Sequence, residues 1–248
     1  MSGICGYRSL PRARRFRSSL LEKMLAAMVH RGPDSLATFP NGRMGLGHAR
    51  LAVIDVPGGL QPFFSEDRRV SVVCDGRLYN SRELRAELRL QGHCVSTDAD
   101  SEVLVHLWEE HGPAMLQKLR GMFALALIDS GTGTLFLARD AAGQKPLFFF
   151  EGKRGLAFAS EMAALQEVPG LEREWDAVAV DQCLSTGDVP GPRTLLRDVQ
   201  QLPPGHCLLQ RNGHAEIRAW DEPGQAAAGD QELSRQKVEE TFERVVGE

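Results

Sequence analysis

The sequence lacks a paired-cysteine motif, a strong net charge and an apolar run long enough to span a membrane. Its five cysteines are scattered and none belongs to a C-x-x-C pair, which suits a reducing compartment. A formal net charge of −4 over 248 residues gives no general attraction to nucleic acid or to an anionic membrane. Because a secretory signal pattern is also missing, we expect a cytoplasmic protein that binds neither nucleic acid nor membrane.

Nucleotide and metal motifs are missing as well. The chain has no Gly-x-x-x-x-Gly-Lys loop and no Gly-x-Gly-x-x-Gly fingerprint. Among the seven histidines, no pair stands four residues apart with an acid at hand, and His106 and His111 miss that spacing. We therefore expect no metal site and no cofactor in this chain.

The elements that are present favour an antiparallel α+β protein. Short apolar segments at 123–128 and 135–138 flank Gly131-Thr132-Gly133, the pattern of a β-hairpin. Apolar residues at helical spacing predict helices over 18–29, 81–91 and 101–111. Strands and short helices interleaved in this way indicate layers of antiparallel sheet and helix. The other predicted elements are strands at 45–55, 70–74, 147–150, 206–210 and 216–220, a turn at 75–77, and helices at 161–166 and 176–184.

The last part of the chain differs in composition. Residues 224–229 are rich in Ala, Gly and Gln, which is typical of a linker, and 231–246 have helical apolar spacing. We expect one domain over 1–222, followed over 223–248 by a linker and the start of a further domain.

The N-terminus carries the first chemical candidate. Ser2 follows the initiator methionine and is small enough to permit its removal, which leaves a free α-amine beside a hydroxyl. The amine has an ordinary pKa of about 7.7–8, so it can accept a proton at neutral pH. A nucleophile and its own base on one residue is an established catalytic device. The plain alternative is that Ser2 only begins a strand.

Seven motifs occur in a fixed order along the chain, and two more follow them. They are MSGI (1–4), HRGPD (30–34), HARLAVID (48–55), DGRLYN (75–80), TDADSE (97–102), RGMFA (120–124) and RDAAGQKPL (139–147), then VPGPRT (189–194) and LPPGH (202–206). This series resembles the glutaminase half of asparagine synthetases, the class II glutamine amidotransferases of the N-terminal-nucleophile fold. The resemblance implies a four-layer αββα sandwich of two antiparallel sheets between helices. It also implies hydrolysis of glutamine, with ammonia passed to an ATP-dependent amide-forming domain.

The resemblance assigns catalytic roles to three positions, and two of them are altered. Ser2 stands where the family has a cysteine nucleophile, and Cys5 cannot replace it because it has no free amine. Asp75 stands where the family has an Asn that donates to the oxyanion, together with the N–H of Gly76. An ionised Asp only accepts hydrogen bonds, so this change removes a donor. The plain alternative for Asp75 is a turn residue after a strand.

Three further positions concern glutamine itself. Arg50 matches the Arg that holds the substrate carboxylate, and Asp100 matches the acid that holds the amino group. Arg77 replaces a family Glu, so a cation stands where an ammonium should bind. Without the resemblance, Arg50 reads as a strand-edge surface charge and Asp100 as the N-cap of the next helix, with Ser101 as the rival cap.

Three functions remain open at this point. The first is an impaired amidotransferase domain that serves a separate ATP-dependent synthetase subunit, which binds the ATP and Mg²⁺. The second is a working glutaminase that uses Ser2, with Asp75 protonated. The third is a Ser2-dependent hydrolase for another acyl substrate. The sequence leaves the oligomeric state open, a homodimer included.

Overall fold

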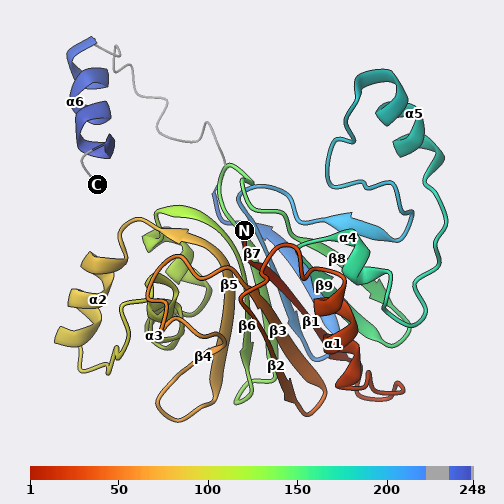
Figure 1. The fold of residues 1–248 in the computed structure, drawn as a ribbon, viewed down its shortest axis with the longest axis horizontal. Helices are drawn as coiled ribbons and strands as arrows, with labels where there is room; N and C mark the ends of the chain where they lie inside the picture. The colour runs from red at the N-terminus through yellow and green to blue at the C-terminus, as the bar shows by residue number, and fades with distance from the viewer. Residues whose placement is uncertain (222–234, 247–248) are drawn as a thin grey trace.

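The computed structural model describes residues 1–221 and 235–246. Within 1–221, two six-stranded sheets lie face to face, with helices on both outer sides (Figure 1). All strand pairs in both sheets are antiparallel. The prediction of an αββα sandwich is therefore confirmed.

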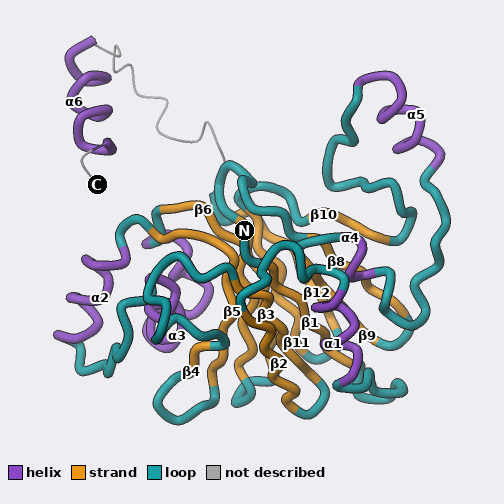
Figure 2. The backbone as a smooth tube through the Cα atoms, in the orientation of Figure 1, coloured by secondary structure: helices purple, strands orange, loops and turns teal. Residues whose placement is uncertain are grey.

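The first sheet holds the N-terminal strand near its centre, in the order β10-β8-β9-β1-β3-β2 (Figure 2). The second sheet has the order β12-β11-β7-β6-β5-β4. The strands of the first sheet are β1 (Gly3–Ser9), β2 (Ser35–Asn41), β3 (Met44–Arg50), β8 (Phe148–Gly152), β9 (Gly155–Ala159) and β10 (Val199–Gln201). Those of the second are β4 (Phe63–Phe64), β5 (Val70–Leu78), β6 (Gly121–Asp129), β7 (Thr134–Arg139), β11 (His206–Arg211) and β12 (His214–Ala219).

The central strands are apolar on both faces because both faces are buried. In β5, Val73 packs between the two sheets, whereas Val72 and Cys74 pack against the helices of the second sheet. Successive strand residues point to opposite faces, so Asp75 shares the inter-sheet face with Val73. This alternation carries a carboxylate into the space between the sheets.

The helices form the two outer layers. On the first sheet lie α1 (Ser19–Ala26) and α4 (Met162–Leu165), and on the second lie α2 (Ser81–Leu90) and α3 (Val103–His111). Figure 1 shows these pairs on opposite sides of the sandwich. The remaining helices of 1–221 are the 3₁₀ turns η1 (Asp100–Glu102) and η2 (Gly112–Lys118), and α5 (Ala177–Thr186).

Two local predictions are wrong. The 75–77 segment is no turn, because Asp75, Gly76 and Arg77 continue β5 and pair with Ala124, Phe123 and Met122. Pairing with a long neighbouring strand overrides the turn preference of Asp-Gly. The strand predicted at 45–55 ends at Arg50, where the chain leaves the sheet.

Four strands escaped the sequence pattern. β4 and β10 are very short, and β9 follows a glycine-containing turn. β2 contains Pro40 and alternates between half-buried and exposed residues, as an edge strand does.

Part of the C-terminal prediction lies outside the described residues, namely the linker at 224–229 and the first residues of the predicted helix, 231–234. The described part of the predicted helix, 235–246, is α6 (Arg235–Val246). In the described ranges, no helix has the length and apolar character needed to cross a bilayer.

Candidate functional site

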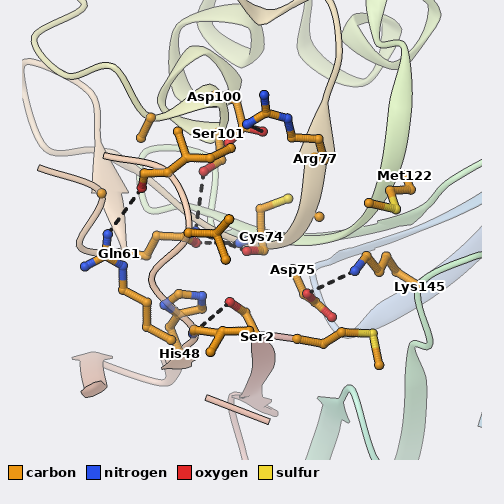
Figure 3. A pocket seen from close by; sticks show the side chains of 18 residues that line it. Ser2, His48, Gln61, Cys74, Asp75, Arg77, Asp100, Ser101, Met122 and Lys145 are labelled. Carbon is orange, nitrogen blue, oxygen red and sulfur yellow. Dashed lines mark hydrogen bonds and ion pairs between the residues drawn. The ribbon is translucent and has the colours of Figure 1, made fainter. Parts of the chain in front are cut away.

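The six residues singled out from the sequence line one pocket of about 420 Å³ at the N-terminal end of the sandwich (Figure 3). Both sheets contribute to it, because Ser2 precedes β1 and Arg50 ends β3, while β5 crosses the other sheet. The six are Ser2, Arg50, Asp75, Gly76, Arg77 and Asp100. A pocket of this size accommodates a small molecule.

Two hydrogen bonds hold Ser2 in place. Its hydroxyl accepts a hydrogen bond from the N–H of Leu51 at 3.2 Å, and its carbonyl accepts one from Nε of Arg31 at 2.8 Å. In the full chain its nitrogen is bonded to Met1, which also lines the pocket. The hydroxyl gains a neighbouring amine only after Met1 has been removed.

Asp75 is the central charge of the site. Its side chain is 2% exposed and accepts a hydrogen bond from Nη2 of Arg31 at 2.8 Å. On its other side, Nζ of Lys145 lies 3.6 Å from Oδ1 (Figure 3). Burial raises the pKa of Asp75, and the charges of Lys145 and Arg31 oppose the rise. A carboxylate with a cation on each oxygen is arranged to accept hydrogen bonds.

Gly76 has no room for a side chain. A Cβ at this position would lie 2.3 Å from the carbonyl oxygen of Met122 on β6. Glycine therefore lets β5 and β6 stay paired at the pocket wall, whatever its N–H contributes to chemistry.

Arg77 and Asp100 form an ion pair in the pocket wall, with Nη1 and Oδ2 4.0 Å apart. The same Oδ2 accepts a hydrogen bond from the N–H of Leu78 at 2.9 Å. Asp100 thus ties η1 to β5. It makes no side-chain cap bond to η1 or α3, and Ser101 makes none either, so both N-cap interpretations are wrong.

Arg50 is buried and fastens the loop that follows β3, which corrects the alternative of a surface charge. Its guanidinium donates to the carbonyls of Val56 and Asp55, each at 2.8 Å, and more weakly to Ile54 at 3.4 Å. These bonds shape the wall of the pocket formed by residues 51–59.

Several residues in or next to the pocket had no predicted role. His48 and Lys145 line the pocket, whereas Arg31 is not part of the lining and contacts Asp75. All three stand within the quoted motifs, which did not indicate that these residues meet. No sequence motif pointed to Gln61. Its side-chain amide donates to the carbonyl of Cys74 and accepts from the N–H of Cys74.

His48 is buried in the pocket wall as a neutral ring. Desolvation lowers its pKa to about 4, and the charge of Arg50 adds to the effect. Neither ring nitrogen has a hydrogen-bond partner in the part of the chain that the structure describes. Both nitrogens are buried, so the ring reaches the pocket as part of its wall.

Cys5 lies outside this chemistry. It is fully buried on β1, on the face covered by α1, and burial raises the pKa of its thiol. A thiol in such surroundings is a poor nucleophile.

The comparisons with known proteins agree with this architecture. A family model described as "Glutamine amidotransferase domain" matches residues 1–221. Asparagine synthetase [glutamine-hydrolyzing] 2 of Bacillus subtilis is 35% identical over 215 residues, covering 84% of this chain and 28% of its own. Asparagine synthetase [glutamine-hydrolyzing] 1 of the same organism is 38% identical over 189 residues, covering 76% and 30%. The chain thus spans about 30% of the length of such relatives.

A solved structure supports the fold alone. The glutamine phosphoribosylpyrophosphate amidotransferase of B. subtilis superposes with a TM-score of 0.62 at 18% identity. The match covers 88% of this chain and 49% of that one.

Proposed function

This chain belongs to the glutamine amidotransferase family, as a class II domain related to asparagine synthetases, and from that premise we propose that its own glutamine hydrolysis is impaired. In this proposal the domain serves an ATP-dependent, amide-forming synthetase that draws on free ammonia or an amine. The pocket then remains as an inherited cavity whose catalytic groups have been replaced.

The environment of Asp75 is the observation that carries the proposal. Attack on the side-chain amide of glutamine places a negative charge on the carbonyl oxygen, which a hydrogen-bond donor must stabilise. The position matched to that donor holds a carboxylate, and both of its oxygens face cations. An ionised carboxylate cannot donate, and its charge repels the oxyanion. Loss of one such donor lowers the rate by about 10²–10³.

The clamp for the substrate amino group is also disturbed. Asp100, the acid expected to meet that ammonium, faces the guanidinium of Arg77 instead, and it is engaged by the N–H of Leu78. A glutamine molecule has to bring its ammonium against Arg77 to reach Asp100. Like charges in a partly desolvated pocket disfavour that pose.

The nucleophile is the third change. The hydroxyl of Ser2 is far less ionised at neutral pH than a thiol, so it depends more strongly on its base. Its activation also requires removal of Met1. Together the three changes fall on the nucleophile, the oxyanion donor and the substrate clamp, while the fold is kept.

The relatives support the proposal of a partner. Their names describe glutamine-hydrolysing asparagine synthetases, and this chain matches about 30% of their length. We propose that ATP and Mg²⁺ are bound by an asparagine-synthetase-like partner, supplied as a separate subunit. Affinity purification of this chain, tagged, from its native cell tests whether an untagged synthetase copurifies with it. If no synthetase copurifies and the chain is a stable monomer in solution, the result counts against this partner.

Ammonia release from glutamine tests the impairment. The wild type is compared with Ser2→Cys, Ser2→Cys/Asp75→Asn and Ser2→Cys/Asp75→Asn/Arg77→Glu, after mass spectrometry has verified that Met1 is absent. We expect no release by the wild type and a gain in kcat of about 10²–10³ when Asp75→Asn is added to Ser2→Cys.

A matched control separates a placed nucleophile from any thiol in the pocket. Ser101→Cys puts a thiol into the same cavity without an adjacent amine, so it stays inactive. Wild-type hydrolysis of glutamine at the rate of the triple variant favours a working Ser2 glutaminase and overturns the proposal.

The pocket lining holds three cationic side chains and two carboxylates, and this excess of cations favours one second candidate. Arg50, Arg77 and Lys145 suit an acyl substrate with an additional carboxylate, which a Ser2-dependent hydrolase would cleave. Hydrolysis of γ-acyl or β-lactam substrates by the wild type, abolished in Ser2→Ala, distinguishes that enzyme from an impaired glutaminase.

A further inference from the structure

Four side chains of the types that bind metals lie together on the outer side of the second sheet, away from the pocket. Glu66 belongs to the turn between β4 and β5, His93 follows α2, and His106 and Glu109 lie one turn apart on α3. One ligand atom from each of the four lies within 4.8 Å of the others. Figure 1 shows these three segments gathered on the side of the sandwich that α2 and α3 cover.

The spacing between these atoms suits a central ion better than direct hydrogen bonds. Nδ1 of His106 lies 3.5 Å from Glu66 and 3.6 Å from Glu109. Nδ1 of His93 lies 3.8 Å from Glu66 and 3.9 Å from Glu109. All four distances exceed a normal hydrogen bond. Ligands of a tetrahedral Zn²⁺, at about 2.0–2.1 Å from the metal, stand roughly 3.4 Å apart.

The burial of His106 supports a bound cation independently of the two glutamates. The residue is 1% exposed, and neither ring nitrogen has a hydrogen-bond partner among residues 1–221 and 235–246. A buried imidazole without partners is costly and rare in a native structure. Its Nδ1 faces the two glutamates, where a bound cation would satisfy it.

His93 is oriented as a ligand. Its Nε2 lies 2.8 Å from a carboxylate oxygen of Glu110. Because a carboxylate accepts a hydrogen bond, the ring proton is on Nε2, and the lone pair of Nδ1 points toward the cluster. Such carboxylate–histidine–metal arrangements are the usual outer contacts of protein metal sites. Glu66 is positioned as well, because its Oε1 accepts the N–H of Cys94 at 3.0 Å.

We propose that Glu66, His93, His106 and Glu109 bind one Zn²⁺-class transition-metal ion. Two imidazoles and two carboxylates suit Zn²⁺ better than Mg²⁺ or Ca²⁺, which prefer oxygen ligands alone. Four protein ligands leave no open position, so the ion is structural. It fastens α3 and the end of α2 to the β4–β5 turn. The site was missed from the sequence because His93 and His106 have no helical spacing and meet only in the fold.

Direct metal binding tests the proposal. The untagged full chain is stripped with EDTA, and Zn²⁺ is titrated in competition with a chromogenic chelator. We expect one Zn²⁺ per chain, a higher melting temperature with Zn²⁺ but not with Mg²⁺, and the visible absorption of tetrahedral Co²⁺ on cobalt substitution.

Variants locate the site. His93→Gln and Glu109→Gln should each lower Zn²⁺ affinity more than 100-fold, because each removes a ligand, and Glu110→Gln about 10–100-fold. Glu109→Gln also removes negative charge from a cluster that contains Glu66, so the metal-free variant is expected to fold. His214→Gln and Glu83→Gln replace exposed residues of the same types elsewhere and should leave affinity unchanged.

Two results overturn the proposal. One is a folded wild type that binds no Zn²⁺ when the ion is supplied at micromolar concentration. The other is Zn²⁺ binding that survives His93→Gln and Glu109→Gln but disappears in Cys94→Ser, since Cys94 is an exposed thiol beside the cluster.

Discussion

Replacing Arg31 by Met tests how strongly the buried charges hold the pocket together. Arg31 is 8% exposed and contacts three groups: the carbonyl of Ser2 at 2.8 Å, Asp75 at 2.8 Å and Glu161 at 3.2 Å. Met keeps much of the apolar stem but removes every one of these donors. The start of β1 and the carboxylate of Asp75 lose their common partner.

The expected cost follows from those contacts. A hydrogen bond to a charged group contributes about 1.5–3 kcal/mol, and a buried charge left without its partner costs about 3–5 kcal/mol. Lys145 stays 3.6 Å from Asp75 and softens the loss. We therefore expect a destabilisation of about 3 kcal/mol, which lowers the melting temperature of a domain of this size by about 10 °C.

The effect should depend on pH in a defined direction. Burial already raises the pKa of Asp75, and Arg31 is one of the charges that oppose the rise, so its removal raises the pKa further. A carboxyl group with a raised native pKa loses stability as pH rises through that value. The gap between wild type and Arg31→Met should thus be widest at neutral pH and narrow as pH falls toward the ordinary pKa of Asp, about 3.9.

Thermal melts from pH 5 to 8, followed by circular dichroism, measure both quantities. Arg218→Met is the matched control, because Arg218 bonds Glu216 twice at 2.6 Å but both side chains are more than half exposed. An exposed pair contributes about 0–1 kcal/mol. Equal melting of Arg31→Met and Arg218→Met, or a gap that widens toward acid, refutes the reasoning.

Two further predictions concern the pocket wall. His48 has a pKa of about 4 in the fold and about 6.5 when exposed, so wild-type stability should fall by up to about 3 kcal/mol as pH drops through that window, and His48→Gln should flatten this part of the profile in urea unfolding. Gly76→Ala places a Cβ 2.3 Å from the carbonyl oxygen of Met122 and should cost about 1–3 kcal/mol in thermal melts, whereas Gly131→Ala, whose Cβ would meet nothing nearer than a side-chain oxygen at 3.2 Å, should melt like the wild type.

The sequence motifs predicted which residues would line the pocket, but they did not predict the contacts that these residues make. Ser2, Arg50, Asp75 and Asp100 come from separate motifs, yet all line one pocket, because their motifs lie where strands and their connections reach the same end of the sandwich. The ion pairs of Asp75 with Arg31 and Lys145 could not be predicted from the sequence, because they join residues that are far apart along the chain and meet only in the fold.

Local composition gave a wrong prediction of the backbone at Asp75 and Gly76. Asp-Gly after an apolar run is typical of a turn, but β6 runs alongside and keeps residues 75–77 in the sheet. The histidine cluster shows the same limit of short-range patterns, because His93 and His106 are brought together only when α3 packs beside the loop after α2.

Labelling with an electrophilic glutamine analogue tests the central claim, that Asp75 and Arg77 have replaced the groups that process glutamine. The wild type and the Ser2→Cys/Asp75→Asn/Arg77→Glu variant, both verified to lack Met1, are incubated with the analogue and weighed by intact-mass spectrometry. We predict no adduct on the wild type and one adduct at position 2 of the variant. One adduct on Ser2 of the wild type would contradict the account.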